Sequence, residues 1–209
     1  MGPHGAAIFI GDAPGLDFLN SVATPADATI DWIDGGEGLL SWLEQAHLVP
    51  VEVLATIRAQ TSRGEIDKVA DQARSLREWF RGFVLAHKGR PLALTDLAEL
   101  EPLNRLLGKD EAHYRIVPQR GGRPTALELR YVRRWRSAEA LLLPIGETLA
   151  RLLCAEDFSH VKACERPGCT LLFADHTRGH VRRWCSMALC GNREKQAAHR
   201  QRLRARRTS

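Results

Sequence analysis

Several features that would reveal a protein's class at once are missing from this sequence. No stretch approaches the roughly 18 to 20 consecutive apolar residues of a membrane-spanning helix, and the opening residues lack the basic region of a secretion signal. The chain has no internal repeat, and its only low-complexity tract is the arginine-rich end. We therefore expect a cytoplasmic protein without a membrane partner.

Catalytic patterns are missing as well. No nucleophile, base and orienting group recur with a recognisable spacing, so we expect no enzymatic activity and assign no catalytic residue. Aromatic residues make up only 6% of the chain and form no array on which single-stranded RNA bases would stack. With 44% hydrophobic and 26% charged residues, the composition is that of a folded globular protein.

Apolar residues recur at helical spacing over most of the first 158 residues. We expect Thr95 to cap one of these helices and Pro102 to kink or divide it. The expected helices cover residues 16–22, 39–43, 51–87 (two helices, separated near 62–64), 95–107 and 137–154.

The segment 114–131 instead alternates apolar and polar residues on either side of a turn-rich loop, which predicts one β-hairpin. The predicted fold class is therefore mainly α with one β-hairpin (α+β), in which a helical N-terminal domain is followed by a small C-terminal unit. At 209 residues the chain has room for two unequal units.

Four of the five cysteines are clustered, with the spacing Cys164-x4-Cys169-x15-Cys185-x4-Cys190. Disulfides explain this poorly in a cytoplasmic protein, because that compartment keeps thiols reduced. Two cysteine pairs joined by a loop can instead give four thiolates to one tetrahedral zinc ion. Since four cysteines close the coordination sphere, we predict one structural Zn²⁺ rather than a catalytic one.

The residues beside the cysteines fit such a site. Pro167 and Gly168 can form a tight turn before the second cysteine, and Gly191 lets the chain bend into a final helix. The remaining cysteine, Cys154, is predicted to be a small buried apolar residue.

Two alternatives for the cluster remain open. An iron–sulfur cluster also takes four thiolates, although nothing in the sequence suggests redox chemistry. A nearby histidine could also replace one cysteine ligand, and the candidates are His160, His176, His180 and His199.

Positive charge is concentrated at one end of the chain. Residues 160–209 contain twelve Lys or Arg and three acidic residues, a net charge of +9, which leaves −4 for the other 159 residues. A concentrated positive surface points to nucleic acid as a partner, and a solvated tail that only aids solubility is the alternative. The residues predicted to contact nucleic acid are Arg178, Arg182, Arg183, Arg193, Lys195, Arg200, Arg202 and Arg204.

Two of these residues have a competing interpretation. Arg182 and Arg183 lie in the loop between the cysteine pairs, where they could instead neutralise the negative charge of four zinc-bound thiolates.

The last 18 residues predict a basic helix with Asn192 as its N-cap. Its few apolar residues can bury little, so the helix is suited to a groove or a phosphate backbone. One expected stripe contains Arg193, Arg200 and Arg204, and an adjacent stripe contains Lys195 and Arg202.

Three polar residues interrupt the apolar helical segments of the first half, namely Asp17, Asn20 and Arg77. They could line a pocket for a small ligand, and structural hydrogen bonds between helices are the alternative.

Two parts of the sequence resemble known families. The runs CERPGC and LFADHTRGHVRRWCSMALCGNREK resemble the CGNR-type zinc finger, named after the motif at residues 190–193. The runs LDFLNSV (16–22), LLSWLEQAHLV (39–49) and LREWF (76–80) resemble the ABATE domain that precedes this finger in bacterial proteins. Thr177, in the run HTRGH, stands where the finger typically has a serine, which affects loop contacts and leaves the cysteines intact.

The resemblance implies a mainly helical bacterial protein that regulates transcription under stress, with the four motif cysteines as zinc ligands. We expect an ABATE-like domain at 1–158, with a sensory or dimerising role, and a zinc finger with a basic helix at 159–209. Double-stranded DNA is the expected partner. An RNA- or ribosome-associated factor and a protein-interaction adaptor with a purely structural zinc are the alternatives.

Overall fold

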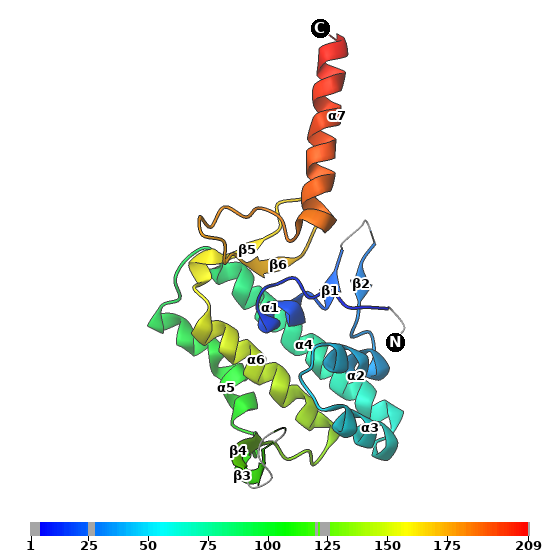
Figure 1. Cartoon of the computed structure of the whole chain (residues 1–209), viewed down its shortest axis with the longest axis vertical. Helices are drawn as coiled ribbons and strands as arrows, with labels where there is room; N and C mark the ends of the chain where they lie inside the picture. The colour runs from blue at the N-terminus through cyan, green and yellow to red at the C-terminus, as the bar shows by residue number, and fades with distance from the viewer. Residues whose placement is uncertain (1–4, 25–27, 120, 122–125, 209) are drawn as a thin grey trace.

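Helices dominate the structure, a computed structural model that describes residues 5–24, 28–119, 121 and 126–208, without the side chains of Ala198 and 203–208 (Figure 1). The α-helices are α1 Pro14–Leu19, α2 Gly36–Gln45, α3 Val51–Gln60, α4 Arg63–His87, α5 Glu101–Leu107, α6 Leu142–Ala155 and α7 Asn192–Thr208. The strands are β1 Val22–Ala23, β2 Ile30–Asp31, β3 His113–Pro118, β4 Leu127–Val132, β5 Val161–Ala163 and β6 Leu172–Ala174. The 3₁₀-helical segments are η1 Leu94–Leu100, η2 Ala138–Leu141 and η3 Phe158–His160, and the π-helical segment is η4 Met187–Gly191.

Helix α4 is the longest element of the body and organises its core. It starts with a capping box, in which Ser62 Oγ accepts the Glu65 N–H and the Glu65 carboxylate accepts the Ser62 N–H. Its buried residues recur at three- and four-residue steps, so one side of the helix faces the core. Helix α2 packs on α4, while α1 packs on both α4 and α6, and α5 covers α6.

The predicted helices are confirmed, with a correction in each of two segments. The helix expected over 16–22 ends at Leu19, and Val22 belongs to β1, where it pairs with Asp31. Pro102 divides the segment 95–107 as expected, because the 3₁₀ turn η1 ends just before it and α5 begins with it in the first turn. Thr95, however, lies inside η1 and does not cap it. Asp96 takes that role, since its carboxylate accepts the Ala93 N–H at 2.8 Å.

The predicted hairpin is confirmed as β3–β4, an antiparallel pair in which Tyr114 lies opposite Tyr131 and Ile116 opposite Leu129. The described residues also form two shorter antiparallel pairs, β1–β2 and β5–β6, where we expected only one hairpin. These strands are two or three residues long, too short for an alternating pattern to be recognised in the sequence.

Cys154 is exposed, so its predicted burial is wrong. It lies near the end of α6, whose buried side contains Leu149 and Leu152 instead.

Among the described helices, none combines the length and the apolar character that crossing a membrane would require.

The core of the helical body continues into the cysteine-rich region. Leu172 and Phe173 of β6 are buried and belong to the same cluster as Phe18 of α1 and Phe80 of α4. Figure 1 shows β5 and β6 lying on the body next to α1, with α7 extending away from it. The predicted boundary at 158/159 falls within η3, and the division into two domains stays a prediction.

Candidate metal centre and nucleic-acid interface

The first cysteine pair is held by the end of β5 and a tight turn. The Cys164 N–H bonds to the Leu171 carbonyl at 2.9 Å, which extends the β5–β6 pairing by one step. The Cys169 N–H closes the turn on the Arg166 carbonyl at 3.0 Å, and Gly168 has φ +78°. Because L side chains rarely adopt that conformation, the predicted Pro-Gly turn is confirmed and depends on this glycine.

Cys190 lies in η4, a π-helical turn, and Cys185 lies directly before Ser186, the residue that caps this turn. Ser186 caps the turn, since its Oγ accepts the Leu189 N–H at 2.9 Å and its carbonyl accepts the Cys190 N–H at 3.1 Å. A π-helix closes its bonds between residues five apart, the spacing of Cys185 and Cys190. Their Sγ atoms lie 3.4 Å apart. The x4 spacing therefore brings both sulfurs to one side.

The four sulfur atoms fit a single zinc ion. Their Sγ atoms all lie within 4.8 Å of one another, and Cys164, Cys185 and Cys190 are buried. Tetrahedral coordination with Zn–S bonds of about 2.3 Å places sulfurs about 3.8 Å apart, in agreement with this cluster. The four cysteines are thus positioned to bind one structural Zn²⁺. All four would bind the ion as thiolates, so four negative charges would lie close together.

The thiols of the cluster do not ionise independently of one another. Hydrogen bonds from the Cys169 and Cys185 thiols lower the pKa of Cys164 to about 2. The same contacts, together with burial, raise the pKa of Cys169 to about 12 and that of Cys185 further still. Negative charge on one sulfur therefore opposes ionisation of its neighbours, and a divalent cation would remove that opposition.

The CGNR segment differs from the prediction in two positions. Gly191 does not bend the chain, since η4 runs directly into α7. A Cβ at this glycine would lie 2.5 Å from Met187 Sδ, so the residue is needed for close packing. Asn192 is not an N-cap, because the helical turn has already begun at Met187. Ser186 is the cap. None of the sequence patterns considered above predicts a π-helical turn directly before an α-helix.

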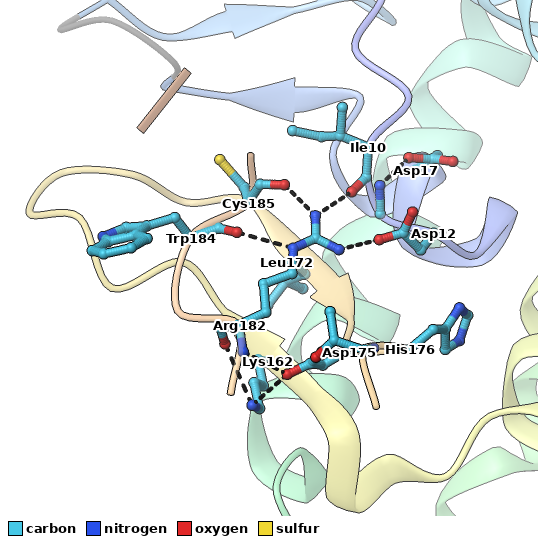
Figure 2. Close-up of polar contacts among 12 residues, drawn as sticks. Ile10, Asp12, Asp17, Lys162, Leu172, Asp175, His176, Arg182, Trp184 and Cys185 are labelled. Carbon is cyan, nitrogen blue, oxygen red and sulfur yellow. Dashed lines mark hydrogen bonds and ion pairs between the residues drawn. The ribbon is translucent and has the colours of Figure 1, made fainter. Parts of the chain in front are cut away.

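Arg182 is committed to protein contacts, as Figure 2 shows. Its guanidinium donates to the carbonyls of Trp184 and Cys185, pairs with the Asp12 carboxylate, and lies 4.2 Å above the Phe173 ring. It also reaches the Ile10 carbonyl at 3.3 Å. These bonds favour a structural role for Arg182 over the predicted nucleic-acid contact. This role differs from the alternative considered above, because the bonds described for its guanidinium go to carbonyls and to Asp12 and not to a cysteine sulfur.

A buried carboxylate next to Arg182 organises the loop between the cysteine pairs. Asp175 is 0% exposed and accepts hydrogen bonds from Lys162 Nζ at 2.7 Å, Thr177 Oγ1 at 2.6 Å and the Arg182 backbone N–H at 2.9 Å (Figure 2). Burial alone would raise the pKa of Asp175, but the bonds from Lys162 and Thr177 hold it well below its usual range. Thr177 is therefore a structural residue of the loop.

The sequence analysis missed Asp175 and Lys162. Both were included only in a charge count, although Asp175 is the one acidic residue between the second and third cysteines of the cluster. A lone carboxylate in so basic a segment is the signal that could have identified it.

The other predicted nucleic-acid residues lie on the surface. Arg183 is exposed, pairs with Glu165 at 2.6 Å, and lies 5.3 Å from the Trp184 ring, which leaves it partly committed. The side chain of Arg204 falls outside the described residues. The remaining predicted residues, which are all exposed or half-buried at the surface, are Arg178, Arg193, Lys195, Arg200 and Arg202.

Helix α7 carries its positive charge on two sides. It has 17 residues, about 25 Å of helix, and projects from the finger at the top of Figure 1. At about 100° per residue, Arg193 and Arg200 share one side, while Lys195 and Arg202 lie about 180° to 200° around the axis. The expectation of adjacent stripes is therefore wrong, since helical geometry places them on opposite sides.

The histidines near the cysteines have other partners. His160 and His180 stack with ring centroids 3.5 Å apart, and His180 Nδ1 lies 2.7 Å from the Asp175 carbonyl. His176 Nε2 lies 2.7 Å from Glu156, and His199 is exposed on α7. The four cysteines are grouped without any of these residues, in agreement with an all-cysteine site.

A second group of possible metal ligands, His87, Asp96 and Glu99, is already neutralised. The guanidinium of Arg90 contacts His87 Nδ1 and donates to both Asp96 oxygens, at 3.0 and 3.2 Å. A fixed cation in this position competes directly with a metal ion, so this group is an ion-pair network.

Both polar atoms of the Asn20 side chain are bonded to the protein. It is 0% exposed, its Nδ2 donates to the Leu172 carbonyl at 2.8 Å, and its Oδ1 accepts the Leu172 N–H at 2.9 Å. The side-chain amide thus pairs with the free edge of β6 as a neighbouring strand would. The Gly11 carbonyl accepts the Ala174 N–H on the same edge at 2.8 Å. The first part of the chain therefore covers the edge of the finger.

Asp17 and Arg77 are likewise bound to the protein. Asp17 accepts the Gly11 N–H at 2.7 Å, and burial raises its pKa. Arg77 is 3% exposed and donates to Asp31 at 2.7 Å and to Ser21 Oγ at 3.0 Å. These contacts favour structural hydrogen bonding, the alternative to the ligand-pocket hypothesis.

A closed cluster of four cysteines followed by a projecting basic helix defines a zinc-finger protein. Residues 160–203 match the model of the CGNR zinc finger, and residues 12–156 match the ABATE family, described as "Putative stress-induced transcription regulator". The chain belongs to the ABATE family and carries a CGNR zinc finger, as the resemblance indicated. A comparison with curated proteins found no match.

Proposed function

We propose that the protein is a stress-responsive transcription regulator that binds double-stranded DNA through α7 and the loop of the zinc finger. The observation that supports this most is the charge on two opposite sides of a helix that projects from a zinc-held base. The proposal assigns the chain no catalytic role.

The two-sided charge suits a groove better than a flat surface. An α-helix fits the major groove of B-DNA, where a phosphate backbone runs along each wall. Arg193 and Arg200 would face one backbone while Lys195 and Arg202 face the other. A helix that lay on a flat anionic surface would use only one of these sides.

The zinc site would fix where α7 enters the groove. Cys190 lies in η4, which runs without interruption into α7, so the metal would hold the start of the helix. The exposed Arg178 and the loop residue Arg183 would add phosphate contacts beside that start.

Fluorescence anisotropy with a labelled DNA duplex, at about 50 and about 200 mM salt, tests the proposal. Removing one arginine from each side, in Arg200→Ala/Arg202→Ala, should weaken binding and lower the log–log salt slope by about 2. The control Arg105→Ala/Arg151→Ala removes the same charge from exposed positions on α5 and α6 and should leave the slope unchanged.

Three results would contradict the proposal. The first is that the zinc-loaded protein does not bind the duplex at low salt. The second is that both double variants lose the same amount of duplex affinity, and the third is that structured RNA displaces the duplex more effectively than unlabelled duplex does. The last result would favour the RNA- or ribosome-associated alternative, because RNA offers the same phosphate charge with a different groove. A protein partner whose affinity survives Arg200→Ala/Arg202→Ala would favour the adaptor.

A further inference from the structure

The hairpin β3–β4 carries an apolar face that is turned outwards. Cross-strand pairing places Tyr114 beside Tyr131 and Ile116 beside Leu129, with Leu127 at the end of the pair. These five side chains are between 52% and 69% exposed. A half-buried hairpin normally shows the opposite arrangement, with its apolar face on the core and its polar face in water.

The other face of the hairpin is the more buried one and carries both polar and apolar residues, the latter being Val117 and Val132. Glu128 and Arg130 are half-buried there and paired with each other. An isolated pair of strands is only marginally stable in water, and a second layer on its apolar face would stabilise it. The exposed face therefore lacks the layer that its residues are suited to contact.

The exposed area is large enough for an association of two chains. Five large apolar side chains, each more than half exposed, offer roughly 600 to 700 Å² of surface. A stable protein–protein interface buries about 800 Å² on each partner. The face can thus supply most of one side of such an interface, and it exceeds the apolar patches of a typical monomer.

We propose that this face is the dimer interface, and that a second copy of the chain stacks its own β3–β4 face on it across a two-fold axis. The five residues bear no charge, so neither a nucleic acid nor a charged peptide would be recognised by them. Like residues oppose each other on the two strands, so the face is similar on either side of its midline. Such a surface is complementary to itself, which a two-fold interface requires.

This dimer goes beyond the proposed DNA binding and constrains it. Figure 1 shows β3 and β4 at the end of the molecule opposite α7. Two chains joined at their hairpins would therefore carry their basic helices at the two far ends of the pair.

Sedimentation velocity of the full-length, zinc-loaded chain, from about 1 µM to about 100 µM, tests the interface. Reducing conditions are needed because the exposed Cys154 could otherwise cross-link two chains. Wild type should be a dimer over this range. Ile116→Lys and Leu129→Lys should each raise the dissociation constant on the order of 100-fold, because each places an unpaired charge in the interface.

The matched control is Leu94→Lys, which adds the same charge at a leucine that is 86% exposed on η1. It should leave the dimer intact. Circular dichroism and zinc content should be unchanged in all three variants, so that loss of the dimer is not loss of the fold. In the background Cys154→Ser, mild oxidation of Ile116→Cys should give a disulfide-linked dimer, since this residue lies near the proposed two-fold axis.

A wild type that stays monomeric at about 100 µM would overturn the proposal. So would a dimer that survives both lysine variants, or an assembly larger than two chains, because neither fits a two-fold contact between hairpin faces.

Discussion

Arg182 and Arg200 are both arginines of the basic C-terminal region, yet the structure uses them in opposite ways. The guanidinium of Arg182 contacts three backbone carbonyls and the Asp12 carboxylate. Arg200 is exposed on a helix that projects from the body. The comparison teaches that charge counts predict a polyanionic partner but do not separate the cations that build the finger from those available to a ligand.

The largest expected effect comes from removing the zinc site, to which the loop that carries Arg182 and the helix that carries Arg200 are both attached. Cys185→Ser/Cys190→Ser should abolish zinc binding, unfold the finger and eliminate duplex binding, because a structural zinc site contributes on the order of 10 kcal/mol to folding. Elemental analysis, thermal unfolding and anisotropy would measure the three effects. The control Cys154→Ser, at the exposed non-ligand cysteine, should retain one zinc per chain. Zinc retained in the double variant would show that the ligand set is wrong.

Arg182→Ala separates the structural arginines from the exposed ones. The free energy of unfolding should fall by about 3 kcal/mol, since the change leaves the Trp184 and Cys185 carbonyls without their donor. Arg178→Ala, at an exposed position in the same loop, should cost less than about 0.5 kcal/mol. Equal losses in chemical denaturation of the two variants would refute the division.

A smaller loss is expected at the edge of β6. Asn20→Ala should lower the free energy of unfolding by about 2 kcal/mol, because the buried Leu172 N–H and carbonyl lose their partners. Asn104→Ala, at an exposed asparagine on α5, is the control for denaturant unfolding. If a small molecule stabilises wild type in thermal-shift assays but not Asn20→Ala, the ligand-pocket hypothesis would regain support.

The smallest effect concerns the contact between the finger loop and the end of α6. The Glu156 carboxylate raises the pKa of His176, with smaller contributions from Asp12 and Asp175. The folded state therefore favours the protonated histidine. Its contribution is complete below about pH 6.5, the ordinary value, and disappears as the pH rises through the raised folded pKa.

We expect this contribution to be under about 1 kcal/mol, because the histidine is largely exposed. Denaturant unfolding of wild type and His176→Gln at pH 6 and pH 8 should show a difference only at the lower pH. A difference of the same size at both pH values would contradict the assignment.

The sequence predicted the elements whose signals are local. Cysteine spacing identified the metal ligands, and periodic leucines and valines identified most helices. The role of Arg182 was not predictable, because its partner Asp12 is 170 residues away in the chain. The capping of η4 by Ser186 was missed because we assumed an ordinary α-helix with Asn192 at its start. The placement of the positive residues on two opposite sides of α7 follows from helical geometry alone, and the prediction of adjacent stripes was wrong.

The bonds that join the first residues to the finger also bear on how the chain matures during synthesis. Asn20 pairs with Leu172, which is 152 residues further along the chain. At about 5 to 20 residues per second, a ribosome takes about 8 to 30 s to add that partner. During that interval the buried amide of Asn20 lacks the partner that it has in the folded chain. The part of the helical body around Asn20 would therefore complete its contacts only after β6 has been made.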